Sequence, residues 1–353
     1  MAALDPAVAA IRTAVRVSLS GVDLGVVPVV GDQTTRTTPR STEVLLACSG
    51  GADSMALAAA AAFVAPRLGL RAGLVTVDHQ LQPGSAQRAE SVAEWARKEG
   101  FDPVVVEPVR VGGRPGGPEA AARDARYEAL VRVAGAHGAG LVLLGHTRED
   151  QAETVLLALL RGAGLRGLAG MPATRAVDGV TLARPLLGIA RAQTRAACAA
   201  LSLRSWEDPH NADPAFARSR ARTLLKSLVD SLGPAVVDNL ARTASLAAAD
   251  ASALDELADL ARAQAANPDG SLRVGALAPL AAAVRTRVLH GWARSLGVAG
   301  ADLSHRHVDA LDALVMDWHG QGAVHLPGAI TVGRLGDRLG VTEKPTDRRG
   351  ADR

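Results

Sequence analysis

Short apolar runs alternate with stretches of helical spacing along the front part of the chain. The first run starts at Val44, and the others cover residues 72–77, 103–106 and 141–144. Continuous apolar runs of this length are typical of strands that are buried on both faces of a parallel sheet. Because a helix-like stretch follows each run, the pattern predicts an α/β fold with a doubly wound parallel sheet.

Apolar residues that recur at helical spacing predict the helices. The expected helices of the front part cover residues 6–19, residues 85–98 with Ser85 as N-cap, residues 118–137, and a segment that starts near Glu149. Past Ser227 the chain becomes alanine-rich, with helices expected over 240–260, over 280–296 with Pro279 at the start, and over 305–318. Residues 325–334 predict a small terminal hairpin.

These elements divide the chain into four parts. Residues 1–40 are expected to form an N-terminal helix and a flexible linker, and residues 41–226 the α/β domain. Residues 227–340 predict a smaller, mainly helical domain, and residues 341–353 a polar tail.

Composition limits the classes of protein and of chemistry. The 353 residues include only two cysteines, Cys48 and Cys198, so no disulfide framework and no cysteine pair for zinc, an iron–sulfur cluster or sulfur transfer is expected. Aromatic residues make up only 2%, which argues against an RNA-binding surface built mainly from stacked rings. No signal peptide is evident, and the apolar tract 44–64 is interrupted by glycine and aspartate, so we expect no membrane span and a cytoplasmic protein.

The net charge is only +3, but the basic side chains are nearly all arginine. Arginine suits the recognition of phosphate, and a GC-rich genome would produce the same bias, so both explanations stay open. The isoelectric point of about 9.3 is compatible with a nucleic-acid partner without requiring one.

The loop after the first apolar run is the stretch with the clearest chemistry. It consists of Ser49, Gly50, Gly51, Ala52, Asp53 and Ser54, and it leads into an alanine-rich helix. The unpaired amide groups at a helix start bind anions, and glycine lets a phosphate approach closely. A carboxylate beside phosphates is understandable if Asp53 holds Mg²⁺ between them. The lysine of the P-loop is missing, and the alternative is an ordinary glycine turn.

A second polar segment follows the strand expected over 141–144. His146 comes directly after this strand, and Asp150 and Glu153 share one face of the next helix. Two carboxylates at a strand end can hold Mg²⁺, bind an ammonium group or accept its proton. The alternative reading for Asp150 is a helix cap at Thr147, and for His146 a buried, hydrogen-bonded histidine.

Arginines form two further candidate groups. Arg126, three residues after Arg123 on one helix, could neutralise a developing phosphate charge, or could lie on a solvated face. Arg218, Arg220 and Arg222 form a late basic cluster in which the first and last share a helix face. Contact with RNA phosphates and a solvated surface are the two readings of this cluster.

Taken together, the motifs resemble one known family. The series comprises Ser-Gly-Gly-x-Asp-Ser at 49–54, Val-Asp-His at 77–79, Ala-Ala-Arg-x-x-Arg-Tyr at 121–127, Gly-His-x-x-x-Asp-Gln-Ala-Glu-Thr at 145–154, Gly-Leu-x-Gly-Leu-x-Gly-Met at 164–171 and Arg-Pro-Leu-Leu at 184–187. In this order, and with the late basic cluster, they are similar to the tRNA(Ile)-lysidine synthetase family of PP-loop (N-type) ATP pyrophosphatases, which have a Rossmann-like fold.

The resemblance implies an ATP-dependent ligase that modifies tRNA. Such enzymes adenylate C2 of the wobble cytidine in the CAU anticodon of tRNA(Ile), and free L-lysine then displaces AMP to form lysidine. The implied cofactors are ATP and Mg²⁺. The family pattern implies pyrophosphate on residues 49–54, Mg²⁺ on Asp53, lysine on Asp150 and Glu153, and catalytic roles for Asp53, Arg126, His146 and the two acids. It leaves tRNA contact to Arg218, Arg220 and Arg222.

Two other functions and the oligomeric state stay open at this point. A PP-loop tRNA thiolase would activate the same kind of base, but its sulfur transfer normally needs paired cysteines. A non-catalytic, nucleotide-sensing RNA-binding protein would be expected to lack the acidic pair, which this chain has at Asp150 and Glu153. The sequence does not fix the number of subunits, and a homodimer is one option.

Overall fold

The computed structural model describes residues 4–21, 43–80, 82, 84–110, 118–207, 213, 215–300 and 302–343. The chain divides into two compact units, Met1–Ala248 and Ala249–Arg353, and the division falls inside helix α9 (Ala235–Ala265). The expected linker over 22–40 and the polar tail from 344 lie outside the described residues. The domain limits drawn from the sequence therefore stay predictions.

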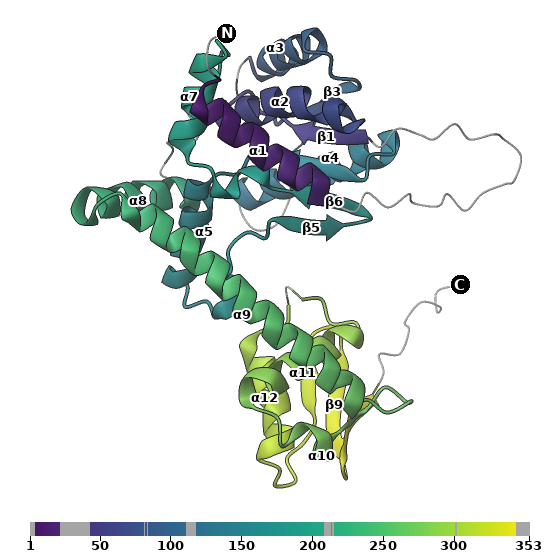
Figure 1. Cartoon of the computed structure of the whole chain (residues 1–353). Coiled ribbons are helices and arrows are strands. Elements are labelled where there is room, and N and C mark those ends of the chain that lie inside the picture. The colour runs from purple at the N-terminus through teal and green to yellow at the C-terminus, as the bar shows by residue number, and fades with distance from the viewer. Residues whose placement is uncertain are drawn as a thin grey trace, which may run out of the picture. The chain divides into compact units, whose positions relative to one another are not determined.

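The first unit is built on a mostly parallel six-stranded sheet (Figure 1). Its strands are β1 (Glu43–Ala47), β2 (Arg71–Asp78), β3 (Val104–Pro108), β4 (Leu141–Leu144), β5 (Thr174–Val177) and β6 (Val180–Ala183). They lie in the order β3-β2-β1-β4-β6-β5, and only the edge strand β5 is antiparallel to its neighbour. The predicted doubly wound α/β fold is confirmed.

Helices cover both faces of this sheet. They are α1 (Pro6–Gly21), α2 (Ala52–Val64), α3 (Ser85–Lys98), α4 (Pro118–His137), α5 (Arg148–Leu160), α6 (Leu165–Leu168), α7 (Arg191–Ala200) and α8 (Ala217–Leu232), with the short 3-10 helices η1 (Ala65–Leu68) and η2 (Pro185–Gly188). One buried core joins α1, α2 and α7 to β1, β2 and β4, and α4 packs in a second core on residues that face the other way, such as Leu45 and Val142. Because strand side chains alternate between faces, β1 contributes to both cores.

The strand order has a topological switch point beside β1. From β1 the chain proceeds to β2 and β3 on one side and then crosses to β4 on the other. At such a switch point the loops after the two adjacent strands diverge and leave room for a ligand at their carboxyl ends. The loops that follow β1 and β4 are the two segments that the sequence singled out.

Several local predictions need correction. Ser85 is the first residue of α3, not its cap, since Gly84 takes the N-cap position with φ 76°, a left-handed conformation that glycine adopts easily. The sequence also missed the hairpin of β5 and β6, whose strands have only four residues each. Pro279 lies ahead of α11 (Ala282–Ser295) and does not open it, because the helix is capped at Ala281.

The second unit combines helices with a small sheet. Besides the end of α9 and α11 it contains α10 (Val274–Leu277), α12 (His305–Met316), β7 (Leu272–Arg273), β8 (Val324–Leu326), β9 (Ile330–Leu335) and β10 (Arg338–Glu343). The strands form an antiparallel sheet in the order β7-β10-β9-β8. The predicted hairpin is confirmed as β8 and β9, and two further strands extend it.

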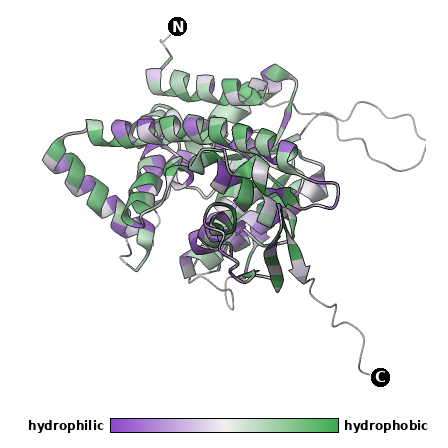
Figure 2. Cartoon of the chain, turned by 90° about the horizontal axis from the view of Figure 1, so that it is seen from below, coloured by the Kyte–Doolittle hydropathy of each residue, from purple (hydrophilic) through white to green (hydrophobic). Residues whose placement is uncertain are grey.

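Hydrophobic and hydrophilic residues alternate along the helices (Figure 2). In α12 this spacing buries Val308, Leu311, Leu314 and Val315 against the sheet and α11. Among the described residues, no helix has the length and apolar character needed to cross a bilayer.

A glycine in β2 allows close packing against β1 and the start of β3. A Cβ atom at Gly73 would lie 2.6 Å from Leu45 Cδ2 on β1 and 2.8 Å from the carbonyl oxygen of Pro103, which directly precedes β3. We expect Gly73→Ala to lower the free energy of unfolding by about 1–3 kcal/mol through overpacking. Gly135→Ala in α4, where a Cβ meets nothing within 4 Å, is the matched control and should be neutral or stabilising. Urea denaturation of both variants measures this, and equal stabilities would contradict it.

Candidate active site

The loop between β1 and α2 has the conformation of an anion-binding turn. Gly50 has φ 82°, and Gly51 caps α2 without any side-chain hydrogen bond to the first turn. Ser54 folds back over the loop, since its Oγ accepts from the Ser49 amide at 3.2 Å and donates to the Gly51 carbonyl at 2.9 Å. The uncapped start of α2 therefore faces the crevice with the positive end of its dipole.

Two neighbouring segments hold this loop in place. The backbone amide of Trp206 donates to the Gly50 carbonyl at 2.9 Å. Gly145, directly after β4, lies so close to α2 that a Cβ there would be 3.2 Å from the Ser54 amide nitrogen. The ends of β1 and β4 are thus in backbone contact, which brings the two predicted motifs together.

Asp150 both caps its helix and faces the crevice. Its Oδ2 accepts hydrogen bonds from the Thr147 amide at 2.8 Å and the Thr147 hydroxyl at 3.0 Å. Its Oδ1 accepts from Arg191 Nη2 at 2.8 Å. The capping role considered from the sequence is therefore present, and it fixes the carboxylate in an orientation that leaves one oxygen for the site.

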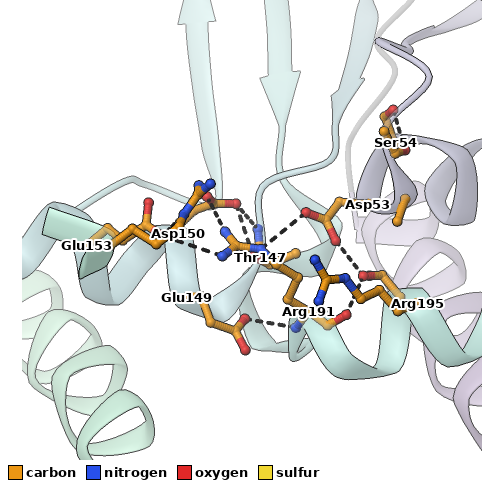
Figure 3. A network of polar contacts seen from close by, with 12 residues as sticks. Asp53, Ser54, Thr147, Glu149, Asp150, Glu153, Arg191 and Arg195 are labelled. Atoms are coloured by element: carbon orange, nitrogen blue, oxygen red, sulfur yellow. Dashed lines mark hydrogen bonds and ion pairs between the residues drawn. The ribbon is translucent and has the colours of Figure 1, made fainter. Parts of the chain in front are cut away.

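Arg191, at the start of α7, joins three acids from two helices (Figure 3). Besides Asp150, its guanidinium lies 3.5 Å from Asp53 Oδ2 and 3.5 Å from Glu153 Oε1. These acids raise the pKa of Arg191 even though its burial acts in the opposite direction. For Asp150 burial also opposes ionisation, but Arg191 and the Thr147 hydrogen bonds prevail and lower its pKa.

Asp53 is held by α7 as well. Thr194, one turn after Arg191, donates its hydroxyl to Asp53 Oδ1 in a short hydrogen bond. Burial raises the pKa of Asp53, and the Thr194 hydrogen bond and Arg191 offset only part of this effect. The carboxylate is thus one that a cation would stabilise further.

Glu153 is the most deeply buried of the three acids, with 2% of the side chain exposed. Its Oε1 accepts from Arg222 Nε at 2.9 Å. Its Oε2 is buried and has no hydrogen-bond partner within the described part of the chain. A buried carboxylate oxygen without a partner costs free energy, so a ligand with N–H groups would be favoured there.

Basic side chains gather on the other side of Asp150. Burial is the main factor that lowers the pKa of Arg126, and Arg123 and Arg218 lower it further. Burial, together with Arg126, Arg184 and Arg218, lowers the pKa of His146 to about 3 despite the opposing effect of Asp150. His146 is therefore a neutral imidazole at physiological pH, with a buried Nδ1 that has no partner among the described residues.

The late arginines separate into two kinds. Arg222 pairs with Glu153, and Arg218 lies 3.9 Å from Glu119, so both side chains are directed toward the first unit's own acids. Arg220 is exposed and donates to the Ala215 carbonyl at 2.9 Å. Of the three, Arg220 is the one presented to solvent.

Sequence reasoning missed Arg191 and Thr194. The order of the elements could in principle have pointed to these two residues, because α7 follows β6, and β6 is the parallel strand next to β4. It was overlooked because the four residues of β6 lie in an unrecognised hairpin. Among the described residues no group of three potential metal ligands is present, so any ion at Asp53 would rely on other oxygens.

Comparisons with known proteins agree with this architecture. Residues 31–228 match the PP-loop domain family, and residues 272–339 match the TilS substrate binding domain. Among solved structures, a U34-tRNA thiolase from Methanococcus maripaludis has a similar fold, with a TM-score of 0.51 and 16% identity over 67% of this chain and 78% of the thiolase.

Curated relatives are much more similar. A tRNA(Ile)-lysidine synthase from Salinispora tropica is 63% identical over 96% of this chain and 97% of its own length. The enzymes of the same name from Salinispora arenicola and Streptomyces coelicolor are 60% and 53% identical, covering 97% and 86% of this chain and 98% and 86% of their own. With a nucleotide loop, an acidic cluster and relatives of this similarity along nearly its whole length, the chain belongs to the tRNA(Ile)-lysidine synthase family.

Proposed function

We propose that this protein ligates lysine to C2 of the wobble cytidine in the CAU anticodon of tRNA(Ile), with ATP as the energy source. The products are lysidine, AMP and pyrophosphate, and the enzyme is a carbon–nitrogen ligase. The observation that carries the proposal is the placement of Asp150 and Glu153 in one ion network with Asp53 of the nucleotide loop. This arrangement suits a reaction in which an amine attacks a carbon whose oxygen has been adenylated.

The first step forms an adenylate. The C2 oxygen of cytidine attacks the α-phosphorus of ATP, and the bond to the β-phosphate oxygen breaks to release pyrophosphate. The uncapped start of α2 and the amide groups of the loop would hold the departing phosphates. Arg126, a half-buried cation with no carboxylate ion pair within the described residues, would stabilise the charge that develops on the α-phosphate.

The second step forms the carbon–nitrogen bond. The ε-amine of lysine attacks C2, and the bond to the AMP oxygen breaks. Lysine arrives as an ammonium ion, so it must lose a proton before the attack. Asp150 and Glu153 would bind this ammonium and accept its proton, and the unpartnered Glu153 Oε2 is the acceptor that supports this role.

Asp53 fits a Mg²⁺ ion that is bound together with ATP. This ion commonly uses one or two carboxylates and completes its shell with phosphate oxygens and water, so a single acid is sufficient. When bound, it would neutralise the charge of the phosphates. Asp53 would hold the ion, and Thr194 would fix the carboxylate through its hydroxyl.

His146 would act as a neutral hydrogen-bonding group. Its lowered pKa keeps the second ring nitrogen unprotonated, so the imidazole can accept a hydrogen bond near the reacting base. The tRNA would contact Arg220 and its neighbours Arg218 and Arg222. The relatives' activity on tRNA and the absence of a membrane-spanning helix among the described residues support the cytoplasmic location expected from the sequence.

A thiolase reading is not favoured. The thiolase from Methanococcus maripaludis carries a [4Fe-4S] cluster and shares only the fold with this chain. The two cysteines here, Cys48 and Cys198, are buried in the core, and both contact the start of α2. A cluster or a persulfide relay needs accessible cysteine ligands, which this pair does not supply.

Incubation with labelled lysine, ATP and a tRNA(Ile) transcript that carries CAU tests the proposal. We expect lysine in the tRNA and one AMP per lysine. Asp53→Asn should lower this turnover by about 10²- to 10³-fold, because it removes the carboxylate that would hold Mg²⁺ against the phosphates. Glu90→Gln, in an exposed pair with Arg97, is the matched control and should keep the parent rate. A transcript left unmodified by the parent protein would refute the proposed function.

Arg220→Ala should weaken tRNA binding with little effect on ATP binding. A single phosphate contact contributes about 0.9 to the slope of log affinity against log salt, so the slope should become shallower by about that amount. Filter binding between low and moderate salt measures it. Arg97→Ala on α3 is the control, and an unchanged slope for Arg220→Ala would assign this arginine to the solvated surface.

The buried His146 should make the fold sensitive to acid. Its pKa is about 3 in the folded protein against an ordinary value of 6.5, so the unfolded chain binds more protons between these pH values. The stabilisation is complete above pH 6.5 and decreases by up to about 1.4 kcal/mol per pH unit as the pH falls toward 3. His146→Gln should therefore flatten the acid side of stability measured by urea denaturation, and His305→Gln, at an exposed site, should not. A parallel shift of both curves would contradict this.

A further inference from the structure

One side chain connects the two halves of the proposed reaction. The Arg191 guanidinium contacts Asp53, which belongs to the nucleotide loop, through Nε at 3.5 Å. The same group contacts Asp150 through Nη2 at 2.8 Å and Glu153 through Nη1 at 3.5 Å. It therefore occupies the position in which the proposed lysine ammonium would bind.

The acceptor oxygens around this position are almost all in use. Asp150 Oδ2 accepts a hydrogen bond from Thr147, and Asp150 Oδ1 accepts one from Arg191. Glu153 Oε1 accepts a hydrogen bond from Arg222 and also pairs with Arg191. Only Glu153 Oε2 is without a partner within the described residues. An ammonium group has three donors, so it gains adequate acceptors at Asp150 and Glu153 only if Arg191 withdraws.

The local charge favours a further cation. Within the described part of the chain, Asp53, Asp150 and Glu153 form ion pairs with two guanidinium groups, those of Arg191 and Arg222. Glu149 adds negative charge nearby, because its Oε2 accepts from the Arg191 backbone amide at 2.8 Å. Arg191 thus neutralises the acids while no ligand is bound, and lysine would have to compete with it.

Only the side chain of Arg191 needs to move. Its backbone is fixed at the start of α7, because its amide donates to Glu149 Oε2 at 2.8 Å. The Nε end already lies beside the loop that would hold the phosphates. Arginine binds phosphate oxygens through two parallel hydrogen bonds, so a triphosphate on the loop offers the guanidinium a strong alternative partner.

We propose that Arg191 is a positioning residue that couples nucleotide binding to lysine binding. Without nucleotide its guanidinium blocks the acidic pair, and the phosphates of bound ATP draw it away and free Asp150 and Glu153 for the lysine ammonium. This inference rests on the proposed function. It predicts positive and reciprocal coupling, in which each ligand raises the affinity for the other by the same factor.

A merely structural ion pair makes the opposite prediction. If Arg191 served only to hold the acids in place, its loss would leave three carboxylates in mutual repulsion, and lysine binding would weaken with and without nucleotide. If Arg191 competes with lysine, its loss improves lysine binding to the nucleotide-free protein. The sign of the change in lysine affinity therefore distinguishes the two.

The test is calorimetric titration of lysine into the full-length protein, alone and saturated with Mg²⁺ and α,β-methylene-ATP, which cannot be cleaved at the bond that breaks. For the parent protein we expect the nucleotide to lower the Kd for lysine by about 10-fold, within the usual range of coupling between sites. Arg191→Gln should bind lysine more tightly than the parent does without nucleotide, and its two Kd values should agree within about twofold. Arg191→Lys keeps a competing charge and should retain the weaker nucleotide-free binding.

Arg195→Gln is the matched control, since Arg195 lies one turn further on α7 and pairs with Glu207 at the surface. It should keep the parent's coupling. Weaker lysine binding by Arg191→Gln without nucleotide, or coupling equal to the parent's, would overturn the inference. So would equal lysine Kd values for the parent protein with and without nucleotide, which needs no variant. The lysidine assay on the parent protein separates the cases: if it forms lysidine but shows no coupling, only this inference fails.

Discussion

The site depends on neutralising carboxylates that are brought together from separate parts of the chain. Asp53 comes from α2, and Asp150 and Glu153 come from α5, so no local pairing along one helix can balance them. Mutual repulsion among buried acids would raise their pKa values and open the crevice. Arg191 and Arg222, from α7 and α8, supply the opposing charge. The position of these helices on the sheet is therefore an electrostatic requirement as well as a packing one.

The order of the strands brings these acids and arginines together. Strands β1, β4 and β6 are neighbours, and the segments after their carboxyl ends lead to α2, α5 and α7. Each of these helices begins at the same edge of the sheet, so its first turn delivers polar side chains to the crevice. One face of each of α2 and α7 packs into the core, through residues such as Leu57 and Ala197. Rigid packing on one side thus fixes charged groups on the other.

The main features could be predicted from sequence because they are local. Ser49, Asp53, His146, Asp150 and Glu153 follow apolar runs that are readable as strands, so their gathering at one edge follows from the order of elements. The partners of these residues could not be predicted in the same way. Arg222 and Glu153 are 69 positions apart in the sequence, and Thr194 and Asp53 are 141 positions apart. The periodicity of apolar residues does not indicate contacts between such remote positions. Arg191 was missed because β6 is too short to have a clear pattern, and the cap of α3 because Gly84, rather than Ser85, takes the left-handed turn.

The backbone contact between Gly145 and the start of α2 has a consequence for selectivity. Because a Cβ at this point would lie 3.2 Å from the Ser54 nitrogen, a side chain between the two loops would be crowded against the backbone of α2. The surface offered to the phosphates there is made of peptide groups, which are the same for every nucleoside triphosphate. Peptide groups recognise the charge and the shape of the phosphates, but they do not distinguish one nucleoside base from another. Discrimination of adenine from guanine must therefore arise elsewhere, from side chains that line the nucleoside end of the crevice.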